Sequence, residues 1–312
     1  MKAIVINKYG DPNVFHEAEI GVPQIKDDEI LIKNYAFSIN FIDDKIRRGE
    51  EKIFPSWNFP IVLGWDLAGI IIKTGKNIHK FKVGNMVYGK LDNFRSPKEG
   101  TYAQFVVTKE KNISLKPKNL SFIQAASVPM AGLTAWQVIK EYLKVKSGQK
   151  ILIQGGSSGV GIFAIQIAKY IGAYVTTTTN PRNFKLVKRL GADQVIDFHK
   201  NLNENINNAF DYVFDTVGDI KSGLTVLKKQ GQFITTIDPF KKELIKQHPK
   251  VNFFRVHASG GDLGKIGVLL ETGKLHTFVT KVFSFLEDDI RVAHEKIQTK
   301  NYRGKLVVDI NR

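Results

Sequence analysis

The chain has 312 residues, of which 43% are hydrophobic and 24% are charged. This is the composition of a globular protein with room for two domains of ordinary size. There is no cysteine, which excludes disulfides, thiolate nucleophiles and any zinc or iron–sulfur centre held by cysteine. The formal net charge is +16, but the basic residues are spread along the chain, so nucleic acid is not expected to be the primary partner.

Signals for membranes, export and metals are absent from the sequence. It has no apolar run of about 18 residues, the length that a membrane span requires. The opening residues, MKAIVINKYG, carry no apolar signal segment, and we therefore expect a cytoplasmic protein. The histidines are scattered without a pair at helical ligand spacing, so no metal site is predicted.

The first part of the chain is predicted to form short strands. Residues 3–6, 29–33 and 70–72 are rich in β-branched and other apolar side chains and are separated by glycine and proline turns. Two more short strands with glycine turns are expected at 83–89 and 100–107. Many short strands with few helices predict a small β-barrel-type domain.

From about Ser121 the pattern changes to alternating strands and helices. Helices are expected at 122–127, 133–143, 183–190 and 224–229, and the intervening strands at 151–153, 174–178, 194–196, 210–215, 232–236 and 251–256. This alternation predicts a doubly wound parallel sheet.

The last part of the chain leaves this alternation. A helix at 261–271, a strand at 278–283, a helix at 287–299 and a strand at 305–309 are expected. Since six strands already complete the parallel sheet, we expect the chain to return to the first domain. The predicted boundaries are therefore 1–122 with 266–312 for the first domain and 123–265 for the second. The asparagine-rich stretch 201–208 is expected to be a solvated loop or helix edge.

The segment 150–169, KILIQGGSSGVGIFAIQIAK, combines a buried-type strand, a glycine turn and an apolar helix. Glycines let a backbone approach a diphosphate, and a helix N-terminus offers free N–H groups and the positive end of its dipole. The order of the three elements is the context that such a motif requires. We therefore predict a dinucleotide diphosphate site at the glycine turn, residues 155–161.

Six short segments spread over nearly the whole chain can be matched to one family: 40–43, 64–69, 100–103, 131–136, 155–161 and 304–308. In their order and spacing they resemble the zinc-free, quinone oxidoreductase-like branch of the medium-chain dehydrogenases/reductases. The resemblance implies a GroES-like fold for the barrel-type catalytic domain and a Rossmann fold for the other. Zinc-dependent relatives carry cysteine at the position of Asn40 and Gly-His-Glu at the position of 64–66, so the resemblance also implies no zinc.

The end of the second strand of the predicted sheet indicates NADPH rather than NADH. An NAD-specific site usually has a carboxylate there, which accepts from the ribose 2′-OH. In this chain Arg182 stands there instead, a cation suited to a 2′-phosphate. The neutral hydrogen-bond donors Thr179, Asn180 and Asn183 surround it in the sequence. The alternative is that Arg182 is only a solvated loop charge.

Further cofactor contacts are implied by the resemblance alone. The resemblance places Asn40, Asp44 and Thr134 beside the nicotinamide half and Phe198 near the adenosine. It also places Ser158, Gly159 and Val160 at the diphosphate, and Val217, Thr236 and Ile237 at later strand ends. The alternative is that Thr134 or Phe198 has only a structural role and does not contact the cofactor.

For the reaction, the resemblance implies hydride transfer from NADPH to a quinone or another electron-poor acceptor. The charge that builds on the acceptor oxygen then needs hydrogen-bond donors, and Asn40 and Lys45 are the predicted catalytic residues. Several relatives have tyrosine at the position of Lys45. Asp43 and Asp44 are interpreted as helix caps.

Two alternatives stay open at this point. One is NADPH-dependent reduction of the double bond of an enone, enal or enoyl thioester. The other belongs to a different class, a crystallin-like or RNA-binding protein that binds NADPH without turnover. The apolar strand 251–256, at the end of the sheet, also predicts a homodimer joined edge to edge.

Overall fold

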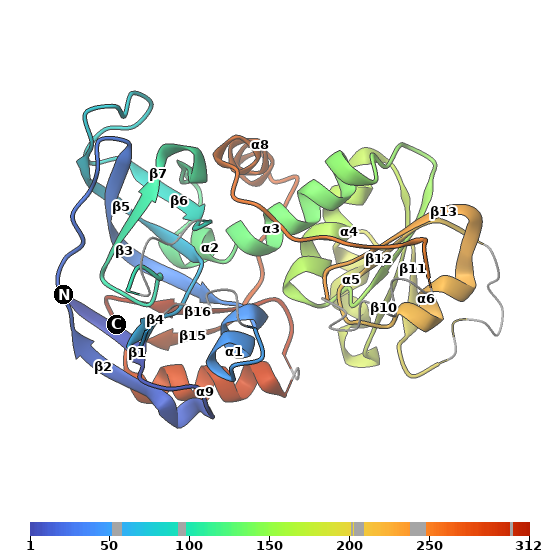
Figure 1. Ribbon diagram of the computed structural model, residues 1–312. Coiled ribbons are helices and arrows are strands. Elements are labelled where there is room, and N and C mark those ends of the chain that lie inside the picture. The colour runs from blue at the N-terminus through green and yellow to red at the C-terminus, as the bar shows by residue number, and fades with distance from the viewer. Residues whose placement is uncertain (52–57, 93–97, 201, 203–208, 238–247, 300–301) are drawn as a thin grey trace. The chain divides into compact units, whose positions relative to one another are not determined.

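The computed structural model describes all residues except 52–57, 93–97, 201, 203–208, 238–247 and 300–301 (Figure 1). The chain divides into two compact units. Unit 1 comprises Met1–Met130, His257–Gly273 and Thr277–Arg312, and unit 2 comprises Ala131–Val256 and Lys274–His276.

Both boundaries differ from the predicted ones, because two helices pack on unit 1. Helix α2 (Phe122–Ala126) contacts β3 (Glu29–Ile39) and β5 (Asp66–Thr74). Helix α8 (Gly260–Glu271) contacts β8 (Ile113–Leu115), and its Leu263 carbonyl accepts a hydrogen bond from the Tyr88 hydroxyl at 2.6 Å. These contacts are between segments far apart in sequence, so residue patterns alone did not locate the boundaries.

Unit 1 confirms the β-barrel-type domain and the predicted return of the C-terminus. One sheet has the order β15-β16-β3-β5-β6-β8, with β7 also paired to β3, and a smaller sheet has the order β2-β1-β4. All pairs except β15–β16 are antiparallel. The remaining strands of the unit are β1 (Lys2–Ile6), β2 (Phe15–Glu19), β4 (Ile61–Val62), β6 (Met86–Lys90), β7 (Phe105–Lys109), β15 (Val279–Ser284) and β16 (Lys305–Asp309).

The core of unit 1 lies between its sheets and helix α9 (Glu287–Gln298). Ile290, Ala293 and Ile297 are spaced to form one stripe of α9, and all three are buried. They join a cluster that includes Phe15, Phe37 and Tyr102. Besides α2, α8 and α9 the unit has the short helices η1 (Pro12–Val14), α1 (Phe41–Arg47) and η2 (Glu110–Asn112).

Unit 2 confirms the doubly wound parallel sheet. Its six strands have the order β11-β10-β9-β12-β13-β14, and every neighbouring pair is parallel. The strand order reverses between β9 and β12, the position at which such sheets bind ligands beyond the carboxyl ends of their strands. The strands are β9 (Lys150–Gln154), β10 (Tyr174–Thr179), β11 (Gln194–Asp197), β12 (Phe210–Asp215), β13 (Leu227–Thr235) and β14 (Val251–Phe253).

Two predicted helices of unit 2 need correction. The helix expected at 224–229 is α6 (Ile220–Val226), and β13 starts directly after it, because Leu227 pairs with Phe210 of β12. The helix expected at 133–143 is α3 (Pro129–Trp136), which continues as the π-helix η3 (Gln137–Tyr142). The other helices in the described part of the unit are α4 (Gly159–Ile171), η4 (Pro181–Asn183) and α5 (Phe184–Arg189).

The predicted solvated segment 201–208 lies outside the described residues except for Leu202, which is buried. Among the residues that the structure describes, no helix is long and apolar enough to cross a bilayer.

Candidate functional site

Three glycines at the turn after β9 have no room for a side chain. A Cβ on Gly156 would lie 2.1 Å from the Thr177 Oγ1 atom. A Cβ on Gly161 would lie 2.2 Å from the carbonyl oxygen of Gly155, and Gly155 itself has a φ of 83°. The turn therefore brings the backbone that follows β9 close to the first turn of α4.

Helix α4 begins with a capped turn that leaves two N–H groups for an anion. The Ser158 Oγ atom accepts from the N–H of Gly161 at 2.9 Å and lies 3.1 Å from the Thr216 Oγ1 atom. The N–H groups of Gly159 and Val160 open the helix, where no preceding turn supplies a carbonyl acceptor. These donors and the helix dipole fit a phosphate group.

The end of β10 carries the residues predicted to read the 2′-phosphate. The Asn180 side chain caps η4 by accepting from the Arg182 N–H at 3.1 Å, and the Arg182 side chain is exposed. Thr179 and Asn183 are only 4% and 5% exposed. Their side chains donate to the Oγ atom of Ser157, at 2.8 Å and 3.1 Å.

The ends of β12 and β13 are organised by Asp215. This buried carboxylate accepts from the N–H groups of Val217 and Gly218, both at 2.9 Å, and from the Thr235 hydroxyl at 2.7 Å. Burial raises its pKa, although these hydrogen bonds act in the opposite direction. The contacts hold the loop in which Val217 is 47% exposed.

The remaining predicted cofactor residues of unit 2 lie at strand ends, with the exception of Thr134. Thr236 and Ile237 are half-buried and follow β13. Phe198 follows β11, is 55% exposed, and has its ring 3.9 Å from that of His199. Thr134 lies on α3 and is 4% exposed, so it does not belong to a strand end. All the other predicted residues of unit 2 lie at or shortly after the carboxyl ends of parallel strands and thus share one edge of the sheet.

In unit 1, Asn40 belongs to a buried polar cluster. Its Oδ1 atom accepts from the Lys305 ammonium at 2.5 Å. Its Nδ2 group donates to the Asp66 carboxylate at 3.0 Å and to the Ser38 carbonyl at 3.3 Å. Since lysine only donates and a carboxylate only accepts, the two partners fix the orientation of the amide, and both Nδ2 hydrogens are used within the unit.

Lys305 is the cation of this cluster. Its Nζ atom also lies 3.5 Å from the Asp66 Oδ2 atom, and the two side chains are 8% and 0% exposed. Burial lowers the pKa of Lys305, while the nearby carboxylates of Asp66 and Asp43 raise it. The Asp66 carboxylate further accepts from the Ser38 hydroxyl at 2.5 Å and from the Met130 N–H at 2.8 Å.

Asp43 caps α1, as the sequence indicated. Its two oxygens accept from the N–H groups of Asn40, at 2.8 Å, and Gly64, at 3.1 Å. Complete burial raises the pKa of Asp43 to about 7, and the neighbouring Asp66 carboxylate acts in the same direction. The capping hydrogen bonds and the Lys305 ammonium lower it but do not compensate.

Asp44 and Lys45, the other two predicted residues of α1, have different surroundings. Asp44 is 0% exposed and forms ion pairs with Arg47 at 2.5 Å and Arg48 at 3.0 Å. Both of its oxygens are thus used inside unit 1. Lys45 is half-buried, and its Nζ atom lies 5.7 Å from the centre of the Phe41 ring.

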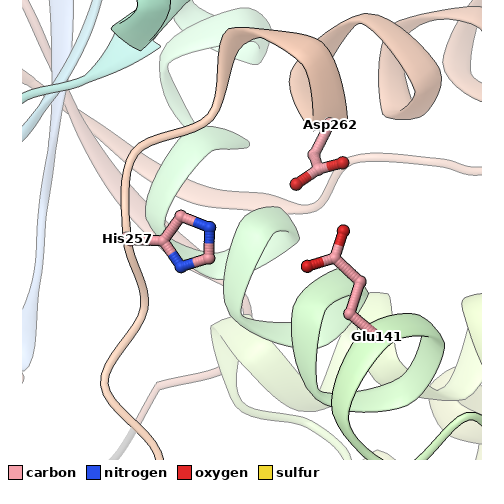
Figure 2. Close-up of side chains that lie close together, drawn as sticks. All are labelled: Glu141, His257 and Asp262. Carbon is pink, nitrogen blue, oxygen red and sulfur yellow. The ribbon is translucent and has the colours of Figure 1, made fainter.

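Three side chains of metal-ligand type are drawn together in Figure 2. His257 and Asp262 belong to unit 1, whereas Glu141 belongs to unit 2. The Asp262 carboxylate already forms an ion pair with Lys265 at 2.9 Å. We assign no metal site to this group, because it draws on both units and its buried carboxylate already has a cationic partner.

Unit 2 combines a parallel sheet with a glycine turn that fits a phosphate, and unit 1 is a β-barrel-type domain. This combination is typical of an oxidoreductase that binds a dinucleotide. Two family models match, "Alcohol dehydrogenase GroES-like domain" over residues 26–118 and "Zinc-binding dehydrogenase" over residues 190–308. The chain belongs to the medium-chain dehydrogenase/reductase superfamily and, within it, to the quinone oxidoreductase-like family, a group of NAD(P)H-dependent oxidoreductases. The family resemblance of the sequence is thereby confirmed.

Individual relatives cover nearly the whole chain. The 2-methylene-furan-3-one reductase of Solanum lycopersicum is 34% identical over 99% of this chain and 79% of its own. The chloroplastic NADPH-dependent alkenal/one oxidoreductase of Arabidopsis thaliana is 33% identical with the same coverage. The solved quinone oxidoreductase of Coxiella burnetii superposes with a TM-score of 0.92, at 33% identity and 99% coverage of both chains.

Sequence reasoning missed the residues that hold the predicted ones in place. Ser157 and Asp215 in unit 2 and Lys305 in unit 1 were not singled out for a site. For Ser157 a signal existed, since it stands inside the glycine turn. Lys305 lies 265 residues from Asn40, and no local pattern joins them.

Proposed function

We propose that this protein is an NADPH-dependent reductase that transfers hydride, without zinc, to a quinone or another electron-poor acceptor. The choice of NADPH over NADH rests on the residues at the end of β10. Arg182 and neutral side chains lie there, and residues 179–183 include no carboxylate. A ribose 2′-OH would lack its usual acceptor there, whereas a 2′-phosphate would meet a guanidinium.

The described residues fit NADPH in unit 2. The glycine turn and the N–H groups of Gly159 and Val160 would hold the diphosphate, and Arg182 would hold the 2′-phosphate. When bound, NADPH supplies the hydride, and the protein supplies orientation and polar groups. Phe198, Val217, Thr236 and Ile237 are proposed to line the same edge.

The buried cluster of unit 1 does not fit zinc, although one matching family model is named for it. At the positions of the zinc ligands this chain has Asn40 and, in the segment 64–66, Trp65 and Asp66. Only Asp66 is an anionic ligand type, and its carboxylate already faces the Lys305 ammonium. We therefore propose a reaction without zinc.

Asn40 and Lys45 remain the proposed catalytic residues. Both Nδ2 hydrogens of Asn40 are used within unit 1, and we propose Lys45, whose ammonium carries three hydrogens, as the donor for an acceptor oxygen that becomes negative. Asn40 would take part through its oxygen, as an acceptor. We expect Lys45→Met to lower kcat about tenfold or more, the effect of removing one such donor. Unchanged turnover in both Lys45→Met and Asn40→Ala would contradict this assignment.

A second candidate is reduction of an activated carbon–carbon double bond. It is favoured by the two plant relatives, one described as a 2-methylene-furan-3-one reductase and one as an alkenal/one oxidoreductase. A panel of quinones, enals, enones and enoyl thioesters, each assayed with NADPH, separates the candidates by kcat/KM. The choice of acceptor rests on this assay, because segments 52–57 and 93–97 lie outside the described residues.

The test of the cofactor is a titration with NADPH and NADH, followed by tryptophan fluorescence. We expect NADPH to bind at least tenfold more tightly, since a phosphate–arginine pair contributes on the order of 1.5–3 kcal/mol. Arg182→Ala should remove most of this preference, whereas Arg189→Ala, an exposed arginine on α5, should keep it. Equal binding of both nucleotides would refute the NADPH assignment.

The same preparation tests the non-enzymatic alternative and the location. NADPH binding without turnover on any acceptor, together with salt-dependent RNA binding, would favour the crystallin-like or RNA-binding class. The cytoplasmic location stays a prediction, because the Arabidopsis relative is described as chloroplastic. Fractionation of the source cells would check it.

A further inference from the structure

The hydroxyl group of Ser157 connects the glycine turn to the end of β10. Its Oγ atom accepts from the Thr179 hydroxyl at 2.8 Å and from the Asn183 amide at 3.1 Å. A serine oxygen has two acceptor positions and one hydrogen. Both acceptor positions are therefore occupied by buried donors, and the hydrogen of Ser157 must point away from Thr179 and Asn183.

Ser157 is the accessible member of this trio. It is half-buried, whereas Thr179 and Asn183 are 4% and 5% exposed. It stands one residue before the N-cap of α4 and contacts the residue that ends β10. The end of the second strand is where sheets of this type read the substituent at the ribose 2′ position.

A hydroxyl with filled acceptor positions discriminates between ligands. It can only donate to an incoming group, and donation to an anionic oxygen is about twice as strong as donation to a neutral one. A 2′-phosphate offers such oxygens, whereas a 2′-OH offers Ser157 only a neutral oxygen and finds no acceptor there for its own hydrogen. The three side chains together thus favour the phosphorylated nucleotide.

We propose that Ser157 donates directly to the 2′-phosphate and determines specificity, with Thr179 and Asn183 as positioning residues that act through it. This inference rests on the proposed NADPH-dependent function. It also revises the sequence-based expectation that Thr179 and Asn183 touch the phosphate themselves, because their polar atoms are turned onto Ser157.

The experiment compares two probes that differ only in the 2′-phosphate, adenosine 2′,5′-bisphosphate and adenosine 5′-monophosphate, by calorimetric titration. In Ser157→Ala the Kd of the bisphosphate should rise about tenfold or more, the loss expected for a hydrogen bond to a charged group. The Kd of the monophosphate should change less than about threefold, since it offers the 2′-position no anion. Ser157→Thr, which keeps the hydroxyl, should keep most of the preference.

Two further variants test the positioning role and the fold. Thr179→Val should lower the preference for the bisphosphate, and Thr179→Ser should restore it, because only the hydroxyl positions Ser157. Ser147→Ala is the matched control, a serine of the same unit whose side chain has only a 3.5 Å contact with the Gly172 carbonyl. All variants are first compared by thermal unfolding. If Ser157→Ala does not fold, Thr179→Val carries the test, and an unchanged preference for the bisphosphate in that variant would overturn the inference.

The outcomes separate this inference from the proposed function. If Ser157→Ala leaves the ratio of the two Kd values unchanged, or weakens both probes equally, Ser157 only shapes the turn and the inference fails. If Arg182→Ala removes the preference while Ser157→Ala does not, the NADPH assignment stands and the inference alone is overturned. If the parent protein does not prefer the bisphosphate, both fail.

Discussion

The Asp44 carboxylate and the Arg47 guanidinium form an ion pair 2.5 Å apart, and both side chains are 0% exposed. Removing one partner of such a pair leaves a buried charge uncompensated. We expect Asp44→Ala to lower the free energy of unfolding by about 3–5 kcal/mol. Urea unfolding at neutral pH measures the change.

The control is an exposed pair of the same kind in the same unit. Asp28 and Lys109 lie 2.9 Å apart with side chains 54% and 44% exposed. Asp28→Ala should change the free energy of unfolding by less than about 1 kcal/mol. Similar losses in the two variants would show that burial does not decide the strength of these pairs.

Asp43 gives a prediction on pH. Its pKa in the folded protein is about 7, against an ordinary value of 3.8 for an aspartate. Between these values the folded state binds more protons than the unfolded state, so stability falls as the pH rises through this window. The contribution of this group amounts to at most about 4 kcal/mol across the window.

The measurement compares the free energy of unfolding at several pH values from 5 to about 8 in the parent and in Asp43→Asn. The variant loses one capping acceptor and is expected to be less stable throughout, so the slope and not the absolute value is the readout. Its stability should fall less steeply with pH than that of the parent. Parallel profiles would mean that Asp43 does not titrate in this range.

At the scale of elements, the strand–turn–helix of residues 150–171 was predictable because its requirements are local. Gly161 shows this, since a Cβ there would lie 2.2 Å from a backbone oxygen that cannot move aside. We expect Gly161→Ala to cost about 1–3 kcal/mol of stability and to abolish nucleotide binding. In Gly21→Ala, where no atom lies within 4 Å of the new Cβ, stability should change by less than about 0.5 kcal/mol. Retained nucleotide affinity in Gly161→Ala would show that the turn can widen.

Elements that depend on distant partners were predicted less well. Leu227 to Lys229 were expected to be helical and are part of β13, because pairing with β12 overrides the local pattern. The unit boundaries were also misplaced, since α2 and α8 belong to unit 1 through contacts with β3, β5 and β8. The periodicity of the sequence can therefore indicate whether a segment is a helix or a strand. The residues at which the segment starts and ends depend on tertiary contacts.

For the whole molecule, the order of motifs was enough to predict both folds and the family, because each motif keeps its place along the chain. The geometry within the candidate site was not predictable in the same way. Asn40 contacts Lys305 from 265 residues away, and Ser157 contacts Asn183 across 26 residues that include α4 and β10. These contacts depend on sheet register, which no single motif encodes. The sequence was enough to predict which side chains are hydrogen-bond donors, but not which acceptor atoms they contact in the folded protein.

The sheet of unit 2 also bears on assembly. Strand β14 stands at one end of the strand order, and in the described part of the chain its outer edge pairs with no further strand. The N–H of Phe254 bonds to the Thr235 carbonyl of β13, so by the alternation along a strand the N–H of Phe253 points to the outer edge. An unpaired edge favours association with a second copy through a two-fold axis.

We therefore predict a homodimer joined through β14, with a mass by light scattering of twice the 35.1 kDa of the chain. Phe253→Pro removes the outward N–H group and should give a monomer, because proline cannot donate to a partner strand. Phe253→Ala shortens the side chain but keeps the N–H, and it should stay dimeric. A parent protein that is monomeric at every concentration would exclude the assembly, and loss of the dimer in both variants would place its energy in the Phe253 side chain rather than in backbone pairing.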